Sequence, residues 1–333
     1  MATPTPTSNQ TPPGGGRRGA VALRASLRDP GFWSNNAVIF GLIVVVVVFT
    51  ILSPSFFTAG NISDLLVSAA ILVVLAVGQQ FAIVVAGIDL SIGSNLPWAA
   101  ALLGFAVTHG WGLPAGIALA IIGGTAVGVV NGLVVTKLRI NDFIVTLGTF
   151  GVMNGLALLL TSGNSVPVNS GFMQDLALDA VGPIRYFWLV ALAVAVVAYV
   201  VLFHTRLGTH LLATGGNRDA ARSMGIKVDR IRIIAYTVSG LLVGLAAVLL
   251  VSRTGTADPS LQTDQLLSSI AAVVLGGASL FGGRASIVGT VAGALLLTVL
   301  INGFTLLDIS QYYQPIAVGL VVVLSAVLSR FQR

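Results

Sequence analysis

The sequence predicts an all-α, polytopic integral membrane protein with about ten transmembrane helices. Its 333 residues are 56% hydrophobic and only 8% charged, whereas soluble domains carry about 25% charged residues. Apolar runs of roughly 20 residues, the length that crosses a bilayer as a helix, recur along the whole chain. A soluble fold of this size could not bury so much apolar surface, so we expect lipid to be its solvent.

The predicted elements follow from these apolar runs in chain order. Residues 1–34 are rich in Pro, Thr and Gly and basic at their end, which is typical of a disordered tail. Residues 35–333 are expected to form the transmembrane domain. Its spans are predicted at 37–53, 64–86, 92–109, 113–135, 143–162, 185–204, 232–252, 264–281, 286–304 and 313–330.

The basic residues support this count, because they alternate between the predicted loops. With a cytoplasmic N-terminus, 15 of the 17 Lys and Arg fall on the inner side, and only Arg185 and Arg253 fall outside. This bias is the positive-inside rule, and it predicts that both termini are cytoplasmic. The net charge of +6 is then explained by topology, and nucleic acid is not an expected partner.

A weak internal echo predicts an inverted repeat. The pair Asn131-Gly132 precedes Gly148 by the same spacing at which Asn302-Gly303 precedes Gly319. The corresponding predicted spans cross the membrane in opposite directions, as in the inverted repeats of many transporters. So few matching residues could also agree by chance.

Glycines also recur at helical spacing within four predicted spans. Such spacing lets helix backbones approach closely, so that packing replaces the hydrophobic force that lipid cannot supply. We therefore expect helix contacts at these glycines: Gly124, Gly128 and Gly132; Gly151 and Gly155; Gly240 and Gly244; Gly289 and Gly293.

The most unusual feature is a basic segment, residues 205–232, between two long apolar runs. It holds six of the 17 Lys and Arg, and its centre reads NRDAARSMG. Asn217 can cap a short helix, Asp219 suits the first turn, and Gly225 can end the helix in the left-handed conformation. A helix over Arg218–Met224 is predicted, with a small apolar side of Ala220, Ala221 and Met224. A plain solvated cytoplasmic loop is the alternative.

The segment ATGGNRDAARSMGIKVDRIRI resembles the cytoplasmic coupling loop of bacterial ABC-importer permeases for monosaccharides, the ribose/xylose/galactoside permease family. Its core fits the looser EAA-x-x-x-G pattern, with Asp219 where Glu is usual. Three further stretches resemble the same family in the same order: AVGQQFAIVVAGIDLSIGS, RINDFIVTLGTFGVMNGLALLL and AAVVLGGASLFGGRASIVGTVAGALLLTVLINGFTLL. The resemblance covers roughly residues 37–330.

This resemblance implies the ABC-importer permease fold, in the bacterial inner membrane, and a set of partners. Two such permeases, identical or closely related, would form the path for a monosaccharide or related polyol. ATPase subunits, or one tandem-domain ATPase, would dock on the coupling loop, and a soluble sugar-binding protein would deliver substrate from outside. The coupling residues would be Asn217, Arg218, Asp219, Ala220, Ala221, Arg222, Met224 and Gly225. No phosphate-binding G-x-x-x-x-G-K-[ST] loop occurs, so ATP and Mg²⁺ are expected on the partner.

The stretch AGIDLSIGS joins the second and third predicted spans and is expected to bend inside the membrane. Asp89 lies at or near membrane depth, where a charge is costly unless paired or hydrated. With Ser91 it is expected to cap the start of the third span at a break between two helices. Contact with substrate, with the gate or with the ATPase side are the alternatives.

Polar side chains inside the predicted spans are mostly amides and hydroxyls, which suit a neutral polyhydroxylated solute. Asn95, Thr146 and Asn154 are our candidates for the translocation path; hydrogen bonding between helices is the alternative for each. No metal site is expected, because the three histidines lack ligand spacing, and no catalytic motif is found. The chain is therefore not expected to be an enzyme.

Two other classes of transporter compete with the importer. An ion-coupled secondary transporter usually needs buried ionisable groups, and Asp89 is almost the only candidate in a chain without Glu. A pore for small neutral solutes explains the uncharged spans but not the capped cytoplasmic helix.

Overall fold

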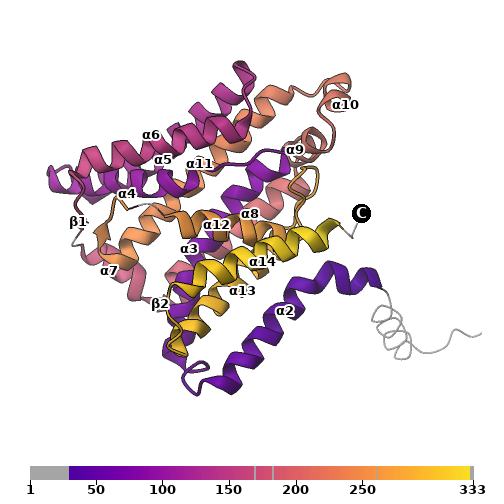
Figure 1. The fold of residues 1–333 in the computed structure, drawn as a ribbon. Helices are drawn as coiled ribbons and strands as arrows, with labels where there is room; N and C mark the ends of the chain where they lie inside the picture. The colour runs from indigo at the N-terminus through magenta and orange to yellow at the C-terminus, as the bar shows by residue number, and fades with distance from the viewer. Residues whose placement is uncertain (1–29, 169, 182–183, 261, 331–333) are drawn as a thin grey trace, which may run out of the picture. The chain divides into compact units, whose positions relative to one another are not determined.

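A computed structural model of the chain describes residues 30–168, 170–181, 184–260 and 262–330 (Figure 1). The helices formed by these residues are α2 (Pro30–Leu52), α3 (Ala59–Val84), α4 (Ile92–Thr108), α5 (Leu113–Lys137), α6 (Asp142–Thr161), α7 (Gly171–Leu178), α8 (Tyr186–His204), α9 (Arg206–Gly216), α10 (Arg218–Ser223), α11 (Val228–Thr254), α12 (Thr263–Leu275), α13 (Ile287–Leu306) and α14 (Tyr313–Arg330). The predicted all-α class is confirmed.

Every predicted span overlaps one of these helices. Among the described residues, six helices are long and apolar enough to cross a membrane: α3, α5, α6, α8, α11 and α13. Shorter apolar helices cover 37–52, 92–108 and 263–275. The protein is thus polytopic, while the count of ten crossings, the inverted repeat and the division into tail and transmembrane domain stay predictions.

Three helix ends differ from the limits of the predicted spans. Helix α2 begins at Pro30, before the first predicted span, since proline is favoured in the first turn of a helix; residues 1–29 lie outside the described part of the chain. Helix α11 begins at Val228 rather than 232 and takes Asp229 into its first turn. Helix α12 ends at Leu275 rather than 281, because Gly277 adopts a φ of +86°. Its 13 residues measure only about 20 Å.

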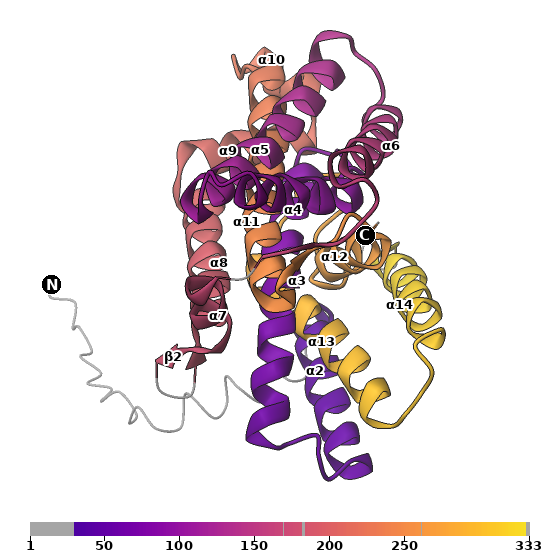
Figure 2. The same ribbon diagram turned by 90° about the vertical axis from the view of Figure 1, so that its left-hand side faces the viewer.

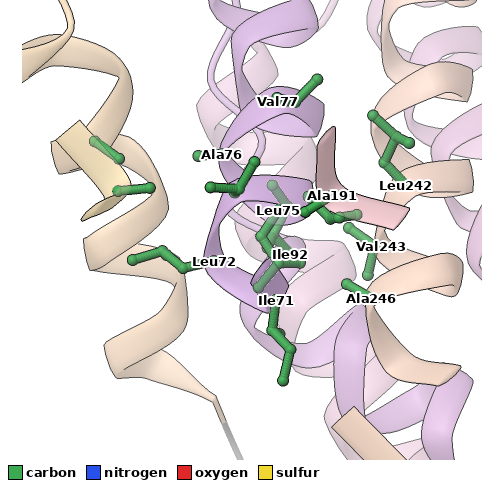
Figure 3. Close-up of a cluster of buried hydrophobic side chains, with 14 of the residues drawn as sticks. Ile71, Leu72, Leu75, Ala76, Val77, Ile92, Ala191, Leu242, Val243 and Ala246 are labelled. Carbon is green, nitrogen blue, oxygen red and sulfur yellow. The ribbon is translucent and has the colours of Figure 1, made fainter. Parts of the chain in front are cut away.

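Helix α3 forms the centre of the fold. In its most apolar stretch, 94% of the residues are buried inside the chain. Leu75 of α3 packs with Ile92 of α4, Ala191 of α8 and Val243 of α11, as Figure 3 shows. Most of this stretch of α3 is therefore surrounded by protein even though the chain as a whole lies in lipid.

Glycines bring α5 and α11 into contact, as their spacing predicted. A Cβ on Gly124 would lie 2.8 Å from the carbonyl oxygen of Gly240 and 2.9 Å from the Cα of Gly244. Gly289 and Gly293 of α13 likewise face backbone atoms of α12 and the loop after it. Gly151 and Gly155 of α6 make no such contact within the chain, because a Cβ on either would meet nothing within 4 Å.

Proline 97 lies inside α4 and leaves one helix carbonyl without its usual partner. That carbonyl, of Gly93, accepts a hydrogen bond at 3.0 Å from the backbone N–H of Gln262, just before α12. The start of α4 is thereby tied to a segment far away in the sequence.

Two small antiparallel pairs connect the helices. Strand β1 (Val166–Pro167) pairs with β4 (Thr256–Ala257), and β2 (Ala180–Val181) pairs with β3 (Ile184–Arg185). Figures 1 and 2 place α10 and the β2–β3 pair toward opposite ends of the helix bundle.

Candidate functional site

The basic segment 205–232 folds into α9, α10 and the start of α11. Helix α10 begins where predicted, because the side chain of Asn217 accepts hydrogen bonds from the N–H groups of Asp219 and the next residue, both at 3.0 Å. Gly225 follows the helix with a φ of +81°, which glycine adopts without strain. The predicted capped helix is present and ends at Ser223, one residue earlier than expected.

The side chains of α10 and its C-terminal flank divide between two faces. The exposed side chains among the predicted coupling residues are Asn217, Asp219, Ala220, Arg222 and Met224. Met224 exposes 70% of its surface, although it is apolar, and Arg222 pairs with Asp219 at 3.6 Å. Ala221 is fully buried. The outer face therefore presents an apolar side chain beside charges that are already paired.

Arg218, the first residue of α10, is only half-exposed. Its guanidinium Nη2 donates hydrogen bonds to the carbonyl oxygens of Val85, at 3.3 Å, and Ala86, at 3.0 Å. These two residues directly follow the end of α3. A cation at this position stabilises the unpaired carbonyls and the negative end of the helix dipole.

Residues 85–91, which we call the α3–α4 break, separate two apolar helices. Asp89 in the break is 1% exposed, and its carboxylate accepts three hydrogen bonds. The donors are the N–H of Ser91 at 3.1 Å, the hydroxyl of Ser91 at 2.5 Å and the hydroxyl of Ser239 on α11 at 2.8 Å. The carboxylate binds the backbone just before α4, and the N-cap position, Ser91, makes no side-chain bond to the first turn.

A chain of hydrogen bonds extends from the break across two more helices. The amide of Asn131 on α5 donates to the hydroxyl of Ser91 at 2.9 Å. The hydroxyl of Thr149 on α6 donates to the amide oxygen of Asn131 at 2.6 Å. The break is thus connected by side chains to α11, α5 and α6.

The start of α6 holds the same break from a second side. Asp142 accepts a hydrogen bond from the backbone N–H of Ile88 at 2.9 Å and another from the hydroxyl of Tyr236 at 3.3 Å. Thr146 donates to the carbonyl of Ile88 at 3.2 Å. Sequence analysis missed Asp142 and Tyr236; the one available signal was an acidic residue at the start of an apolar span.

The three path candidates occupy different surroundings. Thr146 is buried by its contact with the break. Asn95 is 1% exposed and donates to the carbonyl of Gly124 at 3.2 Å, while its Oδ1 has no hydrogen-bond partner. Asn154 lies on α6 and is partly exposed. Of the residues in the most apolar stretch of α6, only 17% are buried, so this helix offers most of its surface to partners or lipid.

Among the described residues no group of three His, Asp or Glu could hold a metal ion. The charged groups of the site are instead engaged with backbone, hydroxyls and one another. What this arrangement can do is mechanical: it connects an exposed, capped helix to a buried break between two membrane-embedded helices.

The comparisons with known proteins agree with this architecture. Residues 61–326 match the family described as branched-chain amino acid transport system / permease component. The ribose import permease protein RbsC of Escherichia coli (strain K12) is 40% identical over 301 residues, which cover 87% of this chain and 91% of the relative. RbsC of Bacillus subtilis (strain 168) is 38% identical over 300 residues, with the same coverage.

The D-allose transport system permease protein AlsC of Escherichia coli (strain K12) is 33% identical over 304 residues, 90% of this chain and 92% of the relative. No solved structure matches the chain. The family match covers most of the sequence and several relatives are alike over nearly their full length, so this chain belongs to the permease family of ABC transport systems, as a membrane-spanning transport subunit rather than an enzyme.

Proposed function

We propose that the chain is the membrane subunit of an ATP-driven importer for a monosaccharide or related polyol. The observation that carries this proposal is the 40% identity to a ribose import permease over 87% of the chain. The family description names branched-chain amino acids, which are zwitterions and need charged partners when desolvated. The one buried acid of the α3–α4 break, Asp89, is already occupied by three donors, which favours a neutral solute.

We propose that the exposed face of α10 docks into a partner ATPase, which binds ATP and Mg²⁺. Support comes from Met224, an exposed apolar side chain next to the self-paired charges of Arg222 and Asp219. Methionine is enriched in the cores of protein interfaces, and charges already paired cost less to cover. An external sugar-binding protein and a second permease chain, identical or closely related, complete the proposed complex.

The proposed orientation puts α10 and both chain termini in the cytoplasm of a bacterium, with the protein in the inner membrane. The excess of basic residues on that side supports it. The β2–β3 pair, toward the other end of the bundle (Figure 2), would then face the binding protein.

Within the membrane we propose that Asn95, Thr146 and Asn154 lie along the solute path. Asn154 is partly exposed on α6, and the Oδ1 atom of Asn95 has no hydrogen-bond partner in the chain. Amide groups of this kind donate and accept hydrogen bonds without binding an ion.

Reconstitution tests the function directly. The permease, its partner ATPase and its binding protein are placed in proteoliposomes, and uptake of radiolabelled ribose, allose and leucine is compared. We expect sugar uptake that needs ATP and the binding protein. Uptake driven by a proton or sodium gradient without the ATPase would refute the proposed ATP-driven importer. Uptake of leucine but of neither sugar would refute the proposed solute class.

Replacing Met224 with alanine tests the docking face. Burying this side chain in an interface is worth about 2 kcal/mol, so the affinity for the ATPase should fall by roughly tenfold or more. Binding is measured in detergent by microscale thermophoresis, without the binding protein. The control is Leu178→Ala on α7, where an equally exposed side chain lies toward the opposite end of the bundle. Equal affinities of the two variants would contradict docking through α10.

A further inference from the structure

We infer that Arg218 is a positioning residue that transmits movement of α10 to the α3–α4 break, instead of a contact to the ATPase. This inference rests on the proposed docking of the ATPase on α10. The inference differs from the docking proposal because it assigns to Arg218 a contact with the α3–α4 break, whereas the residues on the outer face of α10 would contact the ATPase.

The direction of the side chain is the first observation. Arg218 reaches from the first turn of α10 to the carbonyls of Val85 and Ala86, more than 130 residues earlier in the chain. One guanidinium nitrogen bonds both carbonyls, so the contact joins two segments that share no secondary structure. Arg222 and Arg230, in the same basic segment, are exposed instead.

The second observation is that the end of α3 has little room to move independently. The N–H of Gly283 donates to the carbonyl of Val84 at 3.0 Å. A Cβ on Gly282 would lie 2.7 Å from the backbone nitrogen of Ala86, and Ala86 itself has a φ of +56°, which is strained for alanine. A shift of α10 that carries Arg218 therefore has to change the break or lose two charge-assisted hydrogen bonds.

The third observation is where the break leads. Two residues beyond Ala86, the backbone of Ile88 is bonded on both sides to α6, through Asp142 at 2.9 Å and Thr146 at 3.2 Å. One residue further, Asp89 holds Ser239 of α11. A rotation of the break would thus pull on the start of α6, the helix whose surface is mostly free in this chain.

Together these contacts form a continuous physical connection from an exposed cytoplasmic helix to a helix inside the membrane. Such a connection becomes a mechanism only if a perturbation at one end alters the other. The arrangement fits a hinge, where a few residues between rigid elements absorb the change in backbone angles. Arg218 is the part of this connection that α10 supplies.

The test uses the absence of cysteine from the chain, which allows one reporter thiol at a time. Ser223→Cys on the exposed face reports docking of the ATPase, and Ile88→Cys reports the state of the break. Each reporter is combined with native Arg218, with Arg218→Met, with Arg218→Lys and with the control Arg230→Met. Labelling by a water-soluble maleimide is timed in nanodiscs, without ATPase and with ATPase trapped by ATP and vanadate.

We expect the ATPase to protect Ser223→Cys in all four backgrounds. Trapping should change the labelling rate of Ile88→Cys with native Arg218 and with Arg230→Met. Arg218→Met should reduce that change by about tenfold, the effect of losing a charge-assisted hydrogen bond. Arg218→Lys should restore part of it, since an ammonium can still reach a helix C-terminus. If Arg218→Met does not fold, Arg218→Gln keeps a hydrogen-bond donor without the charge, on a shorter side chain.

An unchanged response of Ile88→Cys in Arg218→Met, with Ser223→Cys still protected, would overturn the role of Arg218 and leave the docking proposal standing. Absence of protection at Ser223→Cys in every background would overturn docking itself, and with it the inference. The two failures are therefore distinguishable.

Discussion

Removing the carboxylate of Asp89 should destabilise the chain by an amount that the structure allows to be worked out. In Asp89→Ala three donors lose their acceptor: the N–H and the hydroxyl of Ser91 and the hydroxyl of Ser239. A buried donor left unsatisfied costs about 1–3 kcal/mol. The two hydroxyls can rotate toward other acceptors, whereas the N–H cannot, so we expect a loss near the lower end of the sum, about 3 kcal/mol.

Asp89→Asn separates the hydrogen bonds from the charge. The amide oxygen can still accept both bonds from Ser91, and the amide NH₂ can donate to Ser239, whose hydroxyl also accepts. The loss should therefore be about 1 kcal/mol. The ratio between the losses of unfolding free energy in Asp89→Ala and Asp89→Asn tests whether the carboxylate acts as a structural acceptor, more than either loss does by itself.

Equilibrium unfolding in detergent micelles with increasing denaturant measures both losses. Asp175→Ala on α7 is the control, since this exposed acid should change the free energy of unfolding by less than about 0.5 kcal/mol. If Asp89→Ala and Asp89→Asn are both as mild as the control, the hydrogen bonds of the break contribute nothing to stability and the reasoning is refuted. The same preparations can be assayed for ATP-driven uptake to see whether loss of stability and loss of transport coincide.

Two further predictions concern glycines. Gly124→Ala places a Cβ 2.8 Å from the carbonyl oxygen of Gly240, so overpacking should cost about 1–3 kcal/mol of stability and lower the melting temperature. The control is Gly148→Ala, whose Cβ meets nothing within 4 Å and should be neutral or slightly stabilising. Equal melting temperatures of the two variants would contradict the close contact between α5 and α11. Gly225→Val requires a β-branched residue at a φ of +81° and should leave membrane insertion normal while abolishing ATPase coupling. Gly225→Asn, which tolerates this conformation, should retain coupling, and normal transport by the valine variant would refute the assignment of α10.

Local structure was largely predictable from residue order. The cap at Asn217 and the turn at Gly225 depend on side chains and φ preferences within a few residues. The structure therefore has both where the sequence predicted them. The glycines of α5 and α11 were also predictable, since small residues at helical spacing have few uses besides close packing. Gly151 and Gly155 of α6 share the spacing, yet a Cβ on either would meet nothing within 4 Å in the chain, because spacing alone does not say which face a neighbour covers.

The predicted site was divided by the fold in a way that residue types do not reveal. Arg218 and Arg222 are four positions apart on one helix, yet Arg218 bonds partly buried backbone carbonyls and Arg222 pairs with exposed acids. Asp142 was overlooked because an acid at the start of a span reads as an ordinary first-turn residue. Its partner is the backbone of Ile88, and a backbone group carries no sequence signal.

The sequence by itself determined that this chain lies in lipid, that its elements are helices, and that one short capped helix interrupts its apolar runs. These conclusions follow from composition, hydrophobic length and local capping chemistry, which act over a few residues to a few turns. Only the tertiary structure decided which side chains meet. The hydrogen bonds from Arg218 to Ala86 and from Ser239 to Asp89 join positions far apart in the chain. Such bonds form because burial next to α3 removes water as an alternative partner and leaves each polar group only the neighbours that packing supplies.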